Sequence, residues 1–178
     1  EALPDEVCFF HGTSEARYED GLPEKGVPPI KEAGLLSPKD MRNEDYEVRN
    51  DRLDVVFLSP DPCYAFTYAK RTVSQDANRG VTTKPILLVC TLGRDEVISM
   101  FRFSDRKYPS LADALVKLRL PASLDGKIPS EVTRRGVPAA IIRSVIDLSG
   151  VDHEKDVLRM LPDGVRPLKE LASSRVIG

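Results

Sequence analysis

The chain has 178 residues, with 41% hydrophobic and 30% charged side chains, and its formal net charge is −2 at pH 7. These values indicate one globular domain, residues 1–178, with enough length for a substantial core. They exclude the strong positive field of a general nucleic-acid binder. Two adjacent basic pairs, Lys70-Arg71 and Arg134-Arg135, leave a local basic strip open, although solvated surface charges are the simpler interpretation.

Cysteine residues are too few and too scattered to predict a metal site. Cys8, Cys63 and Cys90 show no metal-ligand spacing, and three cysteines cannot all pair within one chain. They are typical of small core residues, so we expect no metal and a cytoplasmic or otherwise reducing location, with delivery as an effector left open. The longest apolar runs, residues 86–90 and 137–142, are too short to cross a bilayer, and no signal peptide is visible, so we expect no membrane partner.

The first element is a buried strand at residues 7–10, which we expect to end in a turn at His11. A histidine that leaves a strand into a Gly-Thr turn exposes its ring beside backbone amides. Gly12 has no Cβ and allows close approach of a ligand, and imidazole and hydroxyl groups can hydrogen-bond ribose or amide groups. The alternative is a strand-end histidine that is capped by its own turn.

A segment rich in Pro, Gly and charge follows, and residues 15–54 predict a long loop around one short helix. Loops of this length are more often binding loops or lids than passive connections. Residues 55–59 then predict a strand, and Asp61 is expected to cap a helix from residue 63 to about 73 with Pro62 at its first position.

The second half of the chain continues with further elements. Residues 85–92 are almost continuously apolar and predict a central strand. The others are a strand at 97–103, a helix at 110–118, a short strand and turn at 129–136, a helical turn at 138–142 that leads into a strand at 143–148, a helix at 155–161 and a turn at 162–164. Because strands and helices do not alternate regularly, we predict an α+β domain built on antiparallel sheets.

Four short motifs occur in a fixed order along the chain. They are residues 10–14 (Phe-His-Gly-Thr-Ser), residues 30–35 (Ile-Lys-Glu-Ala-Gly-Leu), residues 57–61 (Phe-Leu-Ser-Pro-Asp) with Ala65, Tyr68 and Ala69, and Glu131-Val132 ahead of Gly136-Val137-Pro138 with Ile141. In these motifs the chain resembles the ADP-ribosyltransferase superfamily, in the branch of diphtheria toxin and the poly(ADP-ribose) polymerases. The resemblance implies two antiparallel sheets in a split sandwich, with peripheral helices around a NAD cleft, a core at about 7–148 and a charged C-terminal extension at 152–178.

The resemblance also implies a role for each matching residue. His11 would hydrogen-bond the adenosine-side ribose of NAD, Gly12 would hold the nicotinamide carboxamide through its backbone, and Thr13 would support that turn. Tyr68 resembles the helix tyrosine that stacks on nicotinamide. Glu131 resembles the glutamate that stabilises the oxocarbenium-like ribose as nicotinamide leaves.

Physical chemistry agrees with these roles. Cleavage of the glycosidic bond builds positive charge on the ribose, so a fixed carboxylate lowers the barrier. An aromatic face holds nicotinamide by stacking worth about 1 kcal/mol beyond its buried area. Because Tyr64 is one helical turn from Tyr68, either ring could face the ligand. Ser14, Leu58 and Ser59 complete the expected binding set.

The sequence also departs from the family pattern. Leu58 stands where much of this branch has a second stacking tyrosine, and strand alternation points the neighbouring Phe57 to the opposite face. Asp95 and Glu96 are rivals of Glu131 for the carboxylate role. The plain alternatives are a solvated strand-end glutamate at Glu131 and ordinary core packing at Tyr68 and Leu58.

The leading hypothesis is therefore a toxin- or effector-like transferase that cleaves NAD, its co-substrate, and passes ADP-ribose to an acceptor. The acceptor is open between a protein side chain, a nucleic acid, a small molecule and water. One alternative is an RNA 2′-phosphotransferase-like enzyme, suggested by Leu58-Ser59, whose arginines cannot all be placed here. The other is a degenerate member that binds NAD, ADP-ribose or a protein surface without turnover.

Overall fold

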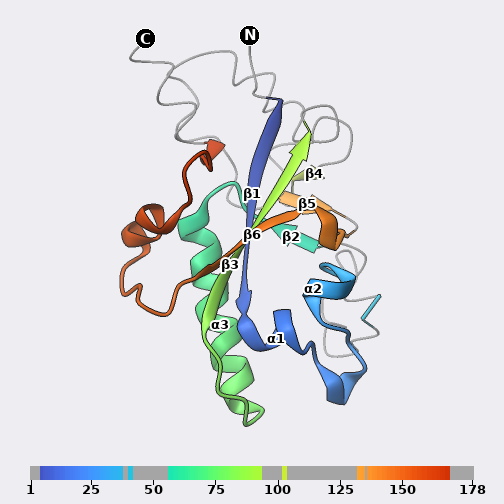
Figure 1. Cartoon of the computed structure of the whole chain (residues 1–178). Coiled ribbons are helices and arrows are strands. Elements are labelled where there is room, and N and C mark those ends of the chain that lie inside the picture. The colour runs from blue at the N-terminus through green and yellow to red at the C-terminus, as the bar shows by residue number, and fades with distance from the viewer. Residues whose placement is uncertain are drawn as a thin grey trace, which may run out of the picture.

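The structure, a computed structural model, describes residues 5–37, 40–41, 56–93, 102–103, 132–134 and 136–168. Two three-stranded antiparallel sheets form its centre, with strand orders β1-β3-β6 and β2-β5-β4 (Figure 1). The prediction of a mixed domain built on antiparallel sheets is confirmed. The strands are β1 (Glu6–Ser14), β2 (Val56–Leu58), β3 (Pro85–Gly93), β4 (Arg102–Phe103), β5 (Val132–Arg134) and β6 (Ile142–Asp147).

One long helix and several short ones accompany the sheets. The helix α3 packs against β1 and β3, and η4 packs against α3. In the view of Figure 1, α3 lies on one side of β1, and β2, β4 and β5 lie on the other. The helices are α1 (Glu15–Glu19), η1 (Pro23–Lys25), α2 (Ile30–Ala33), α3 (Pro62–Asn78), η3 (Ala139–Ile141) and η4 (Glu154–Met160). None of the helices built from described residues is long and apolar enough to cross a membrane.

The strand β1 continues past His11, so the turn predicted there is wrong. His11 pairs with Leu88 and Gly12 with Leu87, and the ladder with β3 continues to Ser14. The strand ends at Ser14 because its hydroxyl accepts the Arg17 backbone N–H at 3.2 Å and caps α1.

Gly12 is required by packing against α3. A Cβ added to Gly12 would lie 1.8 Å from the carbonyl oxygen of Ala65 and 2.7 Å from the nitrogen of Ala69. Since a real Cβ cannot approach so closely, only glycine allows the helix backbone to lie against this strand. The missing side chain therefore makes room for α3, not for a turn.

The alternation of strand side chains divides the core into two clusters, one on each face of the first sheet. The β2-side core consists of Val7, Phe9, Leu35, Val56, Leu58, Ile86, Leu88, Cys90, Leu92, Val137 and Leu168. The α3-side core consists of Phe10, Ala65, Phe66, Leu87, Val89, Ile146, Leu148 and Val157. The strand β3 contributes to both clusters and is the central strand of its sheet, which confirms the prediction from residues 85–92.

Other predicted elements agree in type and differ in length. Asp61 caps α3 by accepting the Cys63 backbone N–H at 2.8 Å, with Pro62 at the first position, as expected. The helix continues five residues beyond the predicted end, because residues 74–78 contain no Pro or Gly. η3 leads directly into β6, and the Val165 N–H donates to the Pro162 carbonyl at 3.1 Å in the predicted turn.

One expectation needs correction, and several lie outside the described residues. The segment after β1 holds α1, η1 and α2 instead of one short helix. The helix predicted at 155–161 is present as the 3-10 helix η4. The segments outside the described residues are the predicted helix at 110–118, residues 97–101 of the predicted strand, residues 129–131 and residues 42–55.

Candidate functional site

Within the described ranges, one backbone pairing beside His11 joins the two sheets. Phe10 N–H donates to the Ser59 carbonyl at 2.7 Å, and Ser59 N–H donates to the Phe10 carbonyl at 2.8 Å. Phe10 therefore directs its backbone groups away from β3. Because these directions alternate along a strand, Gly12 directs its own N–H and C=O to the same edge of β1. This edge, at His11 and Gly12, is the candidate site.

His11 is held in one tautomer by the second sheet. Its ring is half-buried, and Nδ1 lies 2.8 Å from the carbonyl oxygen of Phe57. A carbonyl only accepts, so Nδ1 carries the proton and donates. Burial lowers the pKa of His11; the Phe57 carbonyl opposes this shift, and the charge of Arg17 adds to it. The ring is therefore neutral at pH 7, and Nε2 is left as an acceptor for a ligand hydroxyl.

Tyr64 and Tyr68 form a pair on one side of α3. Their hydroxyl oxygens are 3.2 Å apart, and their ring centroids are 5.4 Å apart at an interplanar angle of 61°. Arg71 lies over the Tyr68 ring, with Cζ 5.2 Å from the centroid. The opposite side of the helix carries Phe66, which belongs to the α3-side core.

The helix backbone that carries these tyrosines lies against the face of β1 at Gly12. Tyr68 directly precedes Ala69, whose backbone nitrogen would lie 2.7 Å from a Cβ added to Gly12, the neighbour of His11. The backbones that carry His11 and Tyr68 are thus within the length of a small ligand. The structure brings His11 together with Phe57, and Tyr64 together with Tyr68, by direct contacts.

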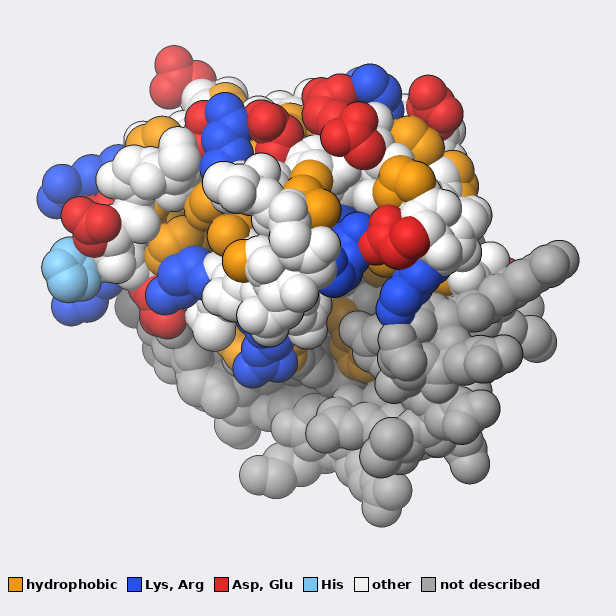
Figure 2. All heavy atoms as spheres, turned by 90° about the horizontal axis from the view of Figure 1, so that it is seen from below, with side chains coloured by type: hydrophobic (Ala, Val, Ile, Leu, Met, Phe, Trp, Pro, Cys, Tyr) orange, Lys and Arg blue, Asp and Glu red, His pale blue; other side chains and the backbone are white. Residues whose placement is uncertain are grey.

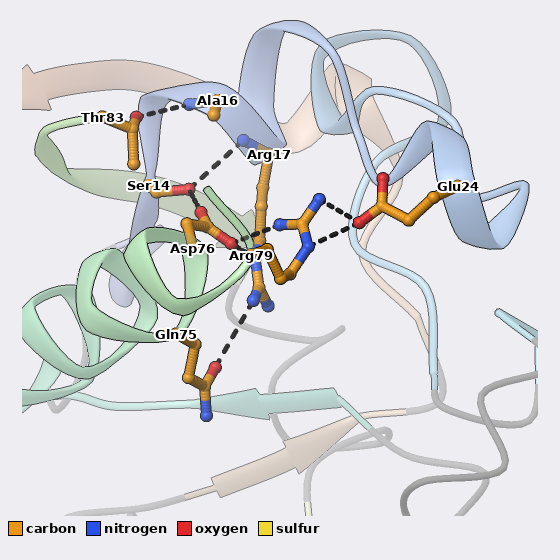
Figure 3. A network of polar contacts seen from close by, with 8 residues as sticks. All are labelled: Ser14, Ala16, Arg17, Glu24, Gln75, Asp76, Arg79 and Thr83. Atoms are coloured by element: carbon orange, nitrogen blue, oxygen red, sulfur yellow. Dashed lines mark hydrogen bonds and ion pairs between the residues drawn. The ribbon is translucent and has the colours of Figure 1, made fainter. Parts of the chain in front are cut away.

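A charged network lies below the end of β1 (Figure 3). Asp76 is fully buried and accepts hydrogen bonds from the Ser14 hydroxyl at 2.5 Å, Arg17 Nε at 3.0 Å and Arg79 Nη1 at 2.6 Å. Arg17 Nη2 also donates to Gln75 Oε1 at 3.4 Å. This network was not predicted from the sequence, although Asp76 lies seven residues after Ala69 and so shares its buried face of α3.

The remaining predicted binding residues have structural roles in the described part of the chain. Thr13 is buried in β1, and Leu58 is 2% exposed in the β2-side core. Ser14 caps α1 and donates to Asp76, and Ser59 Oγ accepts the Asp61 backbone N–H at 3.0 Å. Ligand contact by these four residues stays a prediction, and their burial disfavours direct contact through the side chains.

The predicted carboxylates, Glu131 and its rivals Asp95 and Glu96, lie outside the described residues. Val132, which follows Glu131, begins β5 and pairs with Leu58 of β2. The residue before Leu58 is Phe57, whose carbonyl holds His11. The start of β5 and the candidate site are therefore both connected to β2.

The part of the chain that the structure describes holds no candidate metal site, and the thiol of Cys63 is not activated. No group of three His, Cys, Asp or Glu residues there could hold a metal ion. Burial, reinforced by the Asp61 carboxylate, raises the pKa of Cys63 to about 11, so this thiol is protonated at neutral pH.

On the face drawn in Figure 2, Lys and Arg side chains are interspersed with Asp and Glu, and the described part of that face has no broad patch of one sign.

The chain matches no protein-family model, no curated protein sequence and no solved structure.

Proposed function

We propose that this protein is a NAD-dependent ADP-ribosyltransferase. It cleaves the bond between nicotinamide and ribose and passes ADP-ribose to an acceptor. The observation that carries the proposal is the edge of β1. There, the N–H and C=O of Gly12 point in one direction, next to the neutral His11 ring. A primary carboxamide needs one acceptor and one donor, and a ribose hydroxyl needs an acceptor such as Nε2.

The proposed reaction uses these groups in a defined order. Gly12 and Tyr68 bind the nicotinamide, and His11 accepts a hydrogen bond from the adenosine-side ribose. As the glycosidic C–N bond breaks, its electron pair moves to the nicotinamide nitrogen and the ribose becomes positively charged. A carboxylate beside the ribose stabilises this charge, and the acceptor then attacks the ribose carbon and loses its proton.

Glu131 is the carboxylate that we assign to this step. It directly precedes Val132, which pairs with Leu58 of β2. Leu58 in turn follows Phe57, whose carbonyl accepts the hydrogen bond from His11. No comparable connection to β2 supports Asp95 or Glu96 among the described residues.

The burial of Leu58 supports one competing function, a protein that binds NAD or ADP-ribose without turnover. A leucine that is 2% exposed offers no second ring for the nicotinamide. A protein of this kind would bind NAD and release no nicotinamide, so one assay separates the two functions.

The test is the release of nicotinamide from NAD, compared with release from nicotinic acid adenine dinucleotide. We expect release from NAD and little from the acid analogue, because its carboxylate has no N–H for the Gly12 carbonyl. His11→Ala should weaken NAD binding about tenfold or more, since its hydrogen bond exists in the ground state. His153→Ala is the matched control, because His153 is exposed and makes no side-chain cap hydrogen bond in η4.

Equal release from both dinucleotides would contradict the role of the Gly12 backbone. A wild-type protein that binds NAD but releases no nicotinamide would favour the binding protein. A protein that does not bind NAD would overturn both functions.

A further inference from the structure

Arg17 and Arg79 share one carboxylate but differ in what else they contact. Both side chains are 24% exposed, and both donate to Oδ1 of Asp76. Arg79 also forms an ion pair with Glu24, whereas the second contact of Arg17 is the neutral Gln75. The charge of Arg79 is therefore neutralised by two carboxylates, those of Asp76 and Glu24. Among the described residues, the charge of Arg17 is neutralised by Asp76 alone, and Arg79 contacts the same carboxylate.

The guanidinium of Arg17 is held in place by two contacts and has further N–H donors that these contacts do not use. Asp76 and Gln75 hold Nε and Nη2, as Figure 3 shows, and Nη1 donates to no residue that the structure describes. A planar guanidinium that is already held in place loses little conformational entropy when it binds a phosphate oxygen.

Arg17 is linked to both parts of the candidate site, to His11 through its charge and to the tyrosine side of α3 through Gln75. Its charge acts on the His11 ring, and it contacts Gln75, which lies seven residues after Tyr68 on the same side of α3. A positive charge that acts on a neutral histidine favours a negatively charged ligand over a neutral one.

We propose that Arg17 binds a phosphate group of the ligand whose ribose is held by His11, so that the site selects a nucleoside diphosphate. This inference rests on the proposed function, because it assigns the dinucleotide to the same edge of β1. If Arg17 served only to neutralise Asp76, Arg79 would have the same role. Substitution of either arginine would then have the same effect on ligand binding. Their comparison therefore decides between a ligand contact and a structural one.

The experiment measures the dissociation constants of ADP-ribose and of adenosine by calorimetry, for wild type, Arg17→Gln and Arg79→Gln. A charge-assisted hydrogen bond predicts that Arg17→Gln weakens ADP-ribose binding about tenfold or more and leaves adenosine unchanged. Arg79→Gln disturbs the same carboxylate and should leave both constants nearly unchanged. Equal losses in the two variants, or an equal loss for adenosine, would overturn the inference.

Arg17→Lys keeps the inference testable if Arg17→Gln does not fold. It preserves the charge and loses the planar fork, so we expect a smaller loss of ADP-ribose affinity with adenosine again unchanged. Unchanged ADP-ribose affinity in a folded Arg17→Lys protein would count against a fork-shaped phosphate contact.

Inorganic pyrophosphate separates this inference from the proposed function. If wild type cleaves NAD and Arg17→Gln binds ADP-ribose normally, the inference fails and the proposed function stands. If wild type binds neither NAD nor ADP-ribose, the proposed function fails. In that case, pyrophosphate binding that is lost in Arg17→Gln and kept in Arg79→Gln would still support an anion contact at Arg17. If wild type does not bind pyrophosphate either, the anion contact is overturned too.

Discussion

The carbonyl oxygen of Phe57 accepts a hydrogen bond from His11 Nδ1 at 2.8 Å, and this contact links a strand of one sheet to a side chain of the other. It fixes the tautomer of His11 and leaves Nε2 as an acceptor. The orientation of the ring thus depends on the second sheet as well as on β1.

The first prediction concerns the pH dependence of stability. The pKa of His11 in the folded protein lies below 6.5, mainly because of burial, so the unfolded chain binds this proton first as the pH falls. The contribution of neutral His11 is complete above pH 6.5 and is lost as the pH falls below it towards the folded pKa, with a slope of at most about 1.4 kcal/mol per pH unit.

Urea unfolding at pH 7.5 and 5.5 tests this dependence. His11→Asn should lose less stability on acidification than wild type, whereas His153→Asn should behave like wild type. Parallel losses in all three proteins would show that His11 does not titrate as stated.

The second prediction concerns Gly12. Gly12→Ala forces a Cβ against the backbone of α3, so we expect a loss of about 3 kcal/mol or more in the free energy of unfolding. Gly93→Ala, at the end of β3, meets nothing within 4 Å and should change stability by less than about 1 kcal/mol. Similar values for the two variants in urea unfolding would disprove the close packing at Gly12.

The third prediction concerns the buried carboxylate. Asp76→Asn removes the negative charge that both arginines contact. We expect the free energy of unfolding to fall by about 2–4 kcal/mol. This loss is smaller than for a fully buried ion pair, because both arginines are partly exposed. Asp156→Asn breaks an exposed pair with Arg159 and should cost less than about 1 kcal/mol. Chemical denaturation measures both, and equal costs would rule out a special role for Asp76.

The fourth prediction concerns Cys63. Because its pKa is about 11, we expect iodoacetamide at pH 8 to label it many-fold more slowly in the folded protein than in urea. Its rate in the folded protein should rise about tenfold per pH unit up to pH 10. Peptide mass spectrometry follows this cysteine individually, and equally fast labelling of folded and unfolded chains would contradict the raised pKa.

Elements that depend on local signals were predictable from the sequence. Asp61 and Pro62 start α3 through contacts within two residues, and the apolar run at 85–92 has buried residues on both faces of β3. The end of β1 was not predictable, because residues 11–14 are kept in the strand by β3, more than 70 residues away.

The candidate site was predictable only in part. His11 stood out as a histidine before glycine, but its partner is the backbone of Phe57, which has no side-chain signature. Gly12 was identified by type, whereas the reason for it, contact with Ala65, depends on how α3 packs. The contact between Arg17 and Asp76 spans 59 residues and has no local pattern.

The most direct test of the central claim is nicotinamide release by Glu131→Gln under saturating NAD, with NAD affinity measured in parallel. Glutamine keeps the shape of the side chain and removes its charge. We expect NAD affinity close to wild type and nicotinamide release that is lower by about 10²-fold or more. Release at the wild-type rate from Glu131→Gln, or no release from the wild-type protein itself, would contradict it.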